Sequence, residues 1–251
     1  MSRNPLTITL LATALFAIAL PSTAAAGLII RLTADPGGAN ETVQTFTDGD
    51  ASDQDPTAGN VFLTSFPVFA GPSQTFAINS LSVSTTTVLQ PVDCDVLLDL
   101  LSFAASTLRL EVTLTDLDPA EFVSGGQYYA DIGGIAGIFS PGITISYNSG
   151  FDITNQAFSL ASSVPQFNYT GASNLFNYSA TIPVTALSAP FSMSARYDFT
   201  STGSGQDLGF NSLNEMSVPV PEPGAFIAIG VCVVILALRK RFHTKIPQPA
   251  A

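Results

Sequence analysis

The sequence predicts an all-β fold, an antiparallel β-sandwich of jelly-roll-like type, with a single transmembrane helix near the C-terminus. Three observations predict the sandwich. Apolar and polar residues alternate with a period of two over 108–115 and again over 191–199, as in strands with one buried face. Gly and Pro residues interrupt the chain between such runs, which is typical of turns. The polar positions carry mostly Ser, Thr and Asn, as expected when two antiparallel sheets pack face to face.

Further runs rich in β-forming residues complete the expected strand set. In chain order, strands are expected at Leu28–Thr33, Val61–Phe69, Thr75–Leu89, Leu108–Thr115, Ile143–Tyr147, Asn174–Val184 and Phe191–Phe199. Turn signals between strands are Pro36-Gly37-Gly38, Gly71-Pro72, Gly133-Gly134, Pro141-Gly142 and Gly203-Ser204-Gly205. The segment Val96–Phe103 fits either a helix capped by Asp93 or a buried strand. A strand is favoured because the rest of the chain is β-rich.

One domain is expected over residues 27–205, a length that supports a single core. From Gly203 to Pro223 the chain turns to Gly, Ser, Asn and Pro, a composition typical of a tether, and a flexible linker is expected over residues 206–220. No internal repeat is evident, so the sequence does not support a solenoid or a propeller.

The charge of this domain is strongly negative. Only Arg31, Arg109 and Arg196 are basic between residues 27 and 218, against eighteen Asp and Glu residues, which gives a net charge of −15. Such a surface repels nucleic acid phosphates, so no nucleic acid partner is expected. It suits solubility, divalent cations or contact with cationic groups.

The residues needed by most enzyme classes are missing from the domain. The single histidine is His243, and residues 27–218 contain neither Lys nor Trp. A Ser-His-Asp or Cys-His arrangement and a His/Cys zinc site are therefore excluded there, and the sequence predicts a non-enzymatic domain.

Cys94 has no partner for a disulfide within the domain. Its neighbours Asp93 and Asp95 should raise the pKa of the thiol and make it a poor nucleophile.

An acidic loop offers the one candidate cofactor site, for Ca²⁺. Asp48, Asp50, Asp53 and Asp55 occur within eight residues, and alternating carboxylates in a loop can converge on a calcium ion. The spacing is not that of an EF-hand. The alternative is a solvated acidic loop without a metal.

A second carboxylate group lies at and beyond the end of the strand at 108–115, and comprises Glu111, Asp116, Asp118 and Glu121. Two carboxylates about 5–9.5 Å apart can hydrolyse a glycosidic bond. The absence of Trp from the domain argues against a sugar-cleaving cleft, and an exposed polar loop is the alternative.

The N-terminal 26 residues have the organisation of a signal peptide. Arg3 precedes an apolar segment, Leu6–Leu20, and Ala24-Ala25-Ala26 gives the small-residue pattern that signal peptidase recognises. Cleavage is expected after Ala26, with Gly27 as the new N-terminus.

The C-terminal segment combines three features of a sorting signal. Pro221-Glu222-Pro223 is followed by an apolar run, residues 224–238, and then by Arg239, Lys240 and Arg241. The run approaches the length of a membrane-spanning helix, and the basic cluster predicts a stop-transfer site with the bulk of the chain outside. Over residues 221–245 the arrangement resembles the PEP-CTERM sorting domain of Gram-negative bacteria, and residues 246–251 form a short tail. The resemblance implies recognition by an exosortase and cleavage near Pro221–Pro223.

The predicted function is that of an exported non-enzymatic cell-surface or extracellular-matrix protein, associated with exopolysaccharide or biofilm. Before processing it would be anchored in the inner membrane, and afterwards displayed or secreted. Two alternatives stay open. One is a calcium- or carbohydrate-binding module, and the other is a glycoside hydrolase that uses carboxylates alone.

Overall fold

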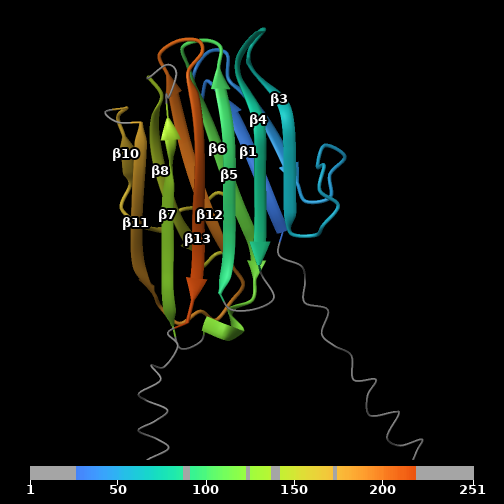
Figure 1. Ribbon diagram of the computed structural model, residues 1–251. Helices are drawn as coiled ribbons and strands as arrows, with labels where there is room; N and C mark the ends of the chain where they lie inside the picture. Colours follow the sequence, from blue (N-terminus) through green and yellow to red (C-terminus); the bar gives the residue numbers. More distant parts are fainter. Residues whose placement is uncertain (1–26, 87–90, 123–124, 137–141, 172–173, 219–251) are drawn as a thin grey trace, which may run out of the picture.

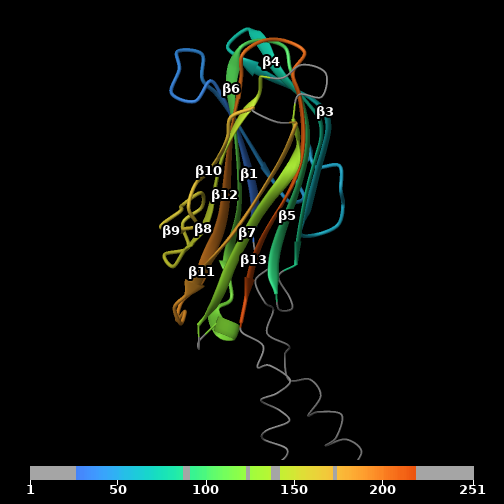
Figure 2. The same ribbon diagram turned by 60° about the vertical axis from the view of Figure 1, so that its left-hand side comes forward.

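The computed structural model describes residues 27–86, 91–122, 125–136, 142–171 and 174–218. In these residues every strand pairing is antiparallel, and the strands form two sheets that pack face to face (Figures 1 and 2). The predicted antiparallel β-sandwich is therefore confirmed, whereas its jelly-roll-like character stays a prediction.

Seven strands form sheet A, in the order β10-β8-β12-β6-β1-β2 with β9 beside β8. They are β1 (Gly27–Ala34), β2 (Thr42–Thr47), β6 (Ser106–Leu117), β8 (Thr144–Asp152), β9 (Ser162–Ser163), β10 (Phe167–Tyr169) and β12 (Phe191–Ser201). Six strands form sheet B, in the order β11-β7-β13-β5-β4-β3. They are β3 (Asn60–Ala70), β4 (Ser73–Thr86), β5 (Val92–Ser102), β7 (Gly126–Ala136), β11 (Leu175–Val184) and β13 (Asp207–Ser217). A short 3-10 helix, η2 (Pro119–Phe122), follows β6.

The expected strands are present, and the ambiguous segment Val96–Phe103 lies almost entirely in strand β5. Two expectations are wrong. The linker expected over 206–220 contains β13, which lies between β7 and β5 in the middle of sheet B, so the domain does not end at residue 205. The pair Gly133-Gly134, expected in a turn, lies inside β7.

The core forms between the sheets because each strand turns its apolar positions inward. In β6 the leucines Leu108, Leu110 and Leu114 are at most 1% exposed, while Arg109 and Glu111 lie on the outer face with their cross-strand partners. Burial of a side chain of this size contributes roughly 1.5–3 kcal/mol relative to exposure.

A group of polar side chains is buried in this core. The hydroxyls of Tyr128, Tyr147 and Ser149 all donate to the amide oxygen of Asn214 on β13. The Tyr197 hydroxyl donates to Ser212 Oγ over 2.9 Å. We call these six residues the tyrosine network. Burial raises the pKa of all three tyrosines, so their hydroxyls stay protonated and act as donors.

The two ends of the described chain, the start of β1 and the end of β13, both lie toward the lower half of the molecule in the view of Figure 1. The part of the chain that the structure describes contains no helical segment that could span a bilayer. The predicted signal peptide, the sorting motif, the segment 224–238 and the basic cluster all lie outside the described residues, so they stay predictions.

Candidate functional site

A shallow groove of about 520 Å³ crosses the outer face of sheet B. It runs over β7, β13, β5 and β4, the four central strands of the sheet, which face the viewer in Figure 1. Its lining residues are Ser80, Leu97, Leu98, Asp99, Gly133, Gly134, Ile135, Asp207, Leu208, Gly209, Phe210 and Asn211. We call this the glycine groove.

The strand register explains why the face is hollow at this point. One row across the sheet reads Ile135, Gly209, Asp99 and Ser80, and in the next row Gly133 pairs with Asn211. Glycines thus occupy one outward position on each of two adjacent central strands. A missing side chain at both positions leaves the floor of the groove as bare backbone.

Packing of the protein does not require glycine at these two positions. A Cβ at Gly209 would lie 3.9 Å from its nearest neighbour, the Leu98 carbonyl oxygen, and one at Gly133 would lie 3.5 Å from Asn177 Oδ1. Both are ordinary contact distances or longer. Glycine weakens the interior of a strand, and there it often marks a place where a ligand approaches the backbone closely. Gly134 differs, because its Cβ would meet the Gly209 carbonyl oxygen at 2.3 Å.

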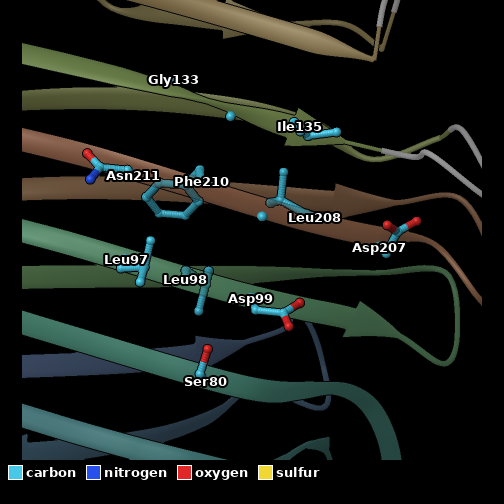
Figure 3. Close-up of a pocket in the computed structure, with 12 residues that line it drawn as sticks. Ser80, Leu97, Leu98, Asp99, Gly133, Ile135, Asp207, Leu208, Phe210 and Asn211 are labelled. Atoms are coloured by element: carbon cyan, nitrogen blue, oxygen red, sulfur yellow. The ribbon is translucent and has the colours of Figure 1, made fainter.

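The walls of the groove combine apolar and acceptor groups. Leu97 and Ile135 are 52% and 42% exposed and supply the apolar part. Figure 3 shows Asp99 and Asp207 toward one end of the groove, and Leu97 and Asn211 toward the other. Asp207 Oδ1 is buried and has no hydrogen-bond partner among the described residues. A buried acceptor without a donor is costly, and Asp207 is one of the residues that line the groove.

The two outer faces of the sandwich differ in charge. All three arginines of residues 27–218 lie on sheet A, in β1, β6 and β12. The outward positions of β5, β7 and β13 carry carboxylates and no basic residue, and these acids are Asp93, Asp95, Asp99, Asp131, Asp207 and Glu215. The face that contains the glycine groove is therefore strongly anionic.

Crowding of these carboxylates affects Asp95. Its pKa is raised by partial burial, and then by the charges of Asp93 and Asp131. A carboxyl whose pKa is raised on folding stabilises the protein below its unfolded pKa of about 3.9, and this stability is lost as the pH rises through the folded value.

Replacement of Asp95 by Asn should therefore increase stability at pH 7 by about 0.5 kcal/mol, a figure reduced for solvent screening. The gain should vanish near pH 3. Urea unfolding of both proteins at the two pH values measures it, and a loss of stability at pH 7 would contradict the repulsion.

The acidic loop between β2 and β3 does not bring its four carboxylates together. Asp48 Oδ2 accepts from the Gly59 amide over 2.7 Å, and Asp50 Oδ2 accepts from the Thr47 amide over 2.8 Å. Asp53 and Asp55 likewise accept from backbone amides, at Gly49, Asp55, Thr57 and Phe62. No group of three or more Asp, Glu, His or Cys residues in the described parts of the chain is placed to hold a metal ion. In this arrangement the four carboxylates bind backbone amides of the loop and of its flanking strands β2 and β3, and the calcium site stays a prediction.

The second carboxylate group is also dispersed. Glu111 lies within β6, and both its carboxylate oxygens are bound, one by Arg31 and the other by Arg196. Asp116 is five residues further along the strand, about 16 Å at the usual rise, and its side chain is exposed and bonded to Asn155. Asp118 Oδ1 accepts from the Ala120 amide. The side chain of Glu121 is outside the described part. Glu111 is therefore not one of a catalytic pair with Asp116.

The raised thiol pKa expected for Cys94 is confirmed. Burial, and after it the charges of Asp93 and Asp95, raise it to about 12. The side chain is 5% exposed and so belongs to the core.

No protein-family model matches the chain, and no curated protein matches it. Several solved structures are distantly similar. The enzymatically active domain of bacteriophage CBA120 tailspike protein 4 is 12% identical over 52% of this chain, with a TM-score of 0.29, and the chain spans 18% of its length.

Two carbohydrate-binding modules are also similar. TmCBM61, solved with β-1,4-galactotriose, is 11% identical over 64% of this chain and 84% of its own, with a TM-score of 0.26. TmCBM27, solved for specific mannan recognition, is 6% identical over 58% of this chain and 90% of its own, with a TM-score of 0.29. Likeness at these scores carries no argument about what this chain binds.

The sequence did not point to the glycine groove. The sequence predicts a turn at Gly133 and a linker at Gly209, and it therefore indicates neither glycine as an outward strand position. For Gly209 a signal is present in the alternation of Leu208 and Phe210 with Gly209 and Asn211, in which glycine stands at a position usually held by a larger residue.

Proposed function

We propose that this chain is an exported, non-enzymatic saccharide-binding protein and that the glycine groove is its binding site. The carrying observation is the bare backbone floor at Gly133 and Gly209, where a side chain would fit but none is present. A sugar ring has C–H faces that pack on such a floor and beside Leu97 and Ile135. Its hydroxyl edges need partners, and Asp99, Asp207 and Asn211 supply acceptors at the rim.

The terminal segments support export. A signal peptide ending at Ala26 and a sorting signal resembling PEP-CTERM would bring residues 27–220 outside the inner membrane, through signal peptidase and an exosortase. The extracellular polysaccharide around the cell is then the partner that the groove would meet. This makes the chain a surface or matrix protein whose anchoring interaction is saccharide binding.

The charge of the groove face disfavours one class of sugar. Six carboxylates and no basic residue lie on the outward positions of β5, β7 and β13, so uronate-bearing polymers are repelled and neutral or amine-bearing sugars are not. An array of neutral, amine-bearing and uronate-containing oligosaccharides, incubated with the full chain, tests the proposal. Binding should be confined to the first two classes. Binding to uronates alone, or to no glycan, would contradict it.

Filling the groove should abolish binding without harming the fold. Replacement of Gly209 by Val places a branched side chain on the groove floor, where the new Cβ has no close neighbour. We expect the affinity for the strongest array ligand to fall at least 30-fold, measured by titration calorimetry. Stability should be unchanged or should rise by up to about 1 kcal/mol, because valine suits a strand better than glycine.

The matched control is Gly203→Val. Gly203 lies in the turn before β13, does not line the groove, and a Cβ there would meet nothing within 4 Å. This variant should bind like the unmodified chain. Unchanged affinity in Gly209→Val would place the site elsewhere.

A further inference from the structure

A second pocket lies on the outer face of sheet A, on the opposite side of the sandwich from the glycine groove. It has a volume of about 200 Å³ and is lined by Ser146, Asn148, Gln166, Arg196 and Asp198. The register makes it a compact patch, because Arg196 pairs with Asn148 and Asp198 pairs with Ser146 across β12 and β8. Gln166 closes one side and donates to Ser146 Oγ and, over 3.2 Å, to Asn168 Oδ1.

One acceptor in this pocket is unsatisfied. Asn148 Oδ1 is buried and has no hydrogen-bond partner among the described residues. Even with the amide turned over, the same buried position would hold an unpaired polar group. Such groups are rare in folded proteins, and here the group belongs to the lining of an open polar pocket. A hydroxyl donor from a ligand would satisfy it.

One donor faces the same space. Arg196 binds Glu111 through Nε at 2.9 Å and Nη2 at 2.8 Å, and no residue in the described part of the chain bonds its Nη1. Glu111 is also bound by Arg31, so the carboxylate is shared between two guanidinium groups and leaves a net positive charge of one. The guanidinium of Arg196 is held in place while one edge stays available.

The remaining lining groups define the chemistry of the ligand. Asp198 is neutralised by Arg109, which bonds both its oxygens, at 2.7 and 3.3 Å, yet each oxygen keeps capacity to accept a further bond. The lining therefore offers acceptors on Asn148 and Asp198 and a donor on Arg196. A pair of neighbouring hydroxyls fits, because each hydroxyl donates to Asn148 or Asp198 and accepts from Arg196.

We propose that this pocket is a second saccharide site, which holds one neutral sugar residue through vicinal hydroxyls. The assignment of a saccharide as the ligand class shares its basis with the proposed function, but the site stands on different residues. With one site on each outer face, a single chain would hold two polysaccharide strands and cross-link them.

The test is an NMR titration of the full isotope-labelled chain, in detergent where its apolar ends require it. The probes are methyl glycosides of glucose, galactose and mannose, each small enough for a pocket of this volume. With at least one probe, the Asn148 side-chain amide and Arg196 Nε–H signals should shift together and saturate.

Asn148→Ala should weaken that binding at least tenfold and leave signals of the glycine groove unchanged. Since Asn148 makes no side-chain hydrogen bond to the described chain, this variant should keep the fold.

Asn177→Ala is the matched control, because Asn177 is exposed on the outer face of sheet B, and it should leave the Arg196 response unchanged. Shifts at Gly133 and Gly209 without shifts at Asn148 and Arg196 would overturn the second site and leave the proposed function intact. Shifts at Asn148 and Arg196 alone would support the second site while counting against the groove. If none of the three probes shifts the signals of the glycine groove or those of Asn148 and Arg196, the second site is overturned.

Discussion

Replacement of Asn214 by Ala is expected to destabilise the folded chain by about 3 kcal/mol, the cost of removing a buried amide whose oxygen is shared by three buried hydroxyls. Asn214 is 2% exposed, and its amide oxygen accepts from Tyr147 over 2.7 Å and also from Tyr128 and Ser149. Asn214 lies in the packed core, where a hydroxyl that loses its acceptor is costly. Low local polarity makes a partly satisfied network worse than an apolar one.

Urea unfolding followed by circular dichroism measures this effect. Asn211→Ala is the matched control, since Asn211 lies three residues earlier on the same strand but points outward and is exposed. The control should change stability by less than about 0.5 kcal/mol. Equal losses in the two variants would show that the tyrosine network does not stabilise the core.

Replacement of Glu111 by Gln is the second change with a large expected effect, about 2–4 kcal/mol of lost stability. The Glu111 side chain is 3% exposed, and its carboxylate lies 2.6 Å from Arg31 Nη2 and 2.8 Å from Arg196 Nη2. Removing its charge leaves two guanidinium groups facing each other across β6 without a counter-ion. Breaking a buried ion pair typically costs 3–5 kcal/mol, and the lower range applies because both arginines are 34% exposed.

Asp198→Asn provides the comparison for this variant. Asp198 binds a single arginine, Arg109, and is 25% exposed, so its loss should cost no more than about 1 kcal/mol. Thermal and urea unfolding of the two variants should therefore separate clearly. If Glu111→Gln were no less stable than Asp198→Asn, the shared carboxylate would not stabilise sheet A.

Most strands could be predicted from the sequence because their inward positions are apolar. Leu108–Leu114 and Phe191–Phe199 alternate without interruption, and both form central strands of sheet A. The sequence pattern does not predict strand β13, and the reason is physical. Two of its inward positions, Ser212 and Asn214, are polar, because they satisfy the tyrosine network from across the core. Pairing along both edges and the burial of Leu208, Phe210 and Met216 outweigh that local signal.

The candidate sites were harder to predict, because they depend on register. Because Asp48, Asp50, Asp53 and Asp55 are close in the sequence, they predict a shared calcium site. In the structure these carboxylates bind the backbone of their own loop and its flanking strands. The glycine groove combines positions from β4, β5, β7 and β13, up to about 130 residues apart. Only the pairing of these strands places Gly133 and Gly209 in adjacent rows, and no local pattern encodes that pairing.

The measurement that tests the central claim most directly is a crystal structure of the protein with the oligosaccharide that binds best on the array. We predict a sugar ring lying on the backbone at Gly133 and Gly209, with hydroxyls that donate to the side chains at the rim, Asp99, Asp207 and Asn211. A sugar bound away from sheet B, with the glycine groove empty, would contradict the account.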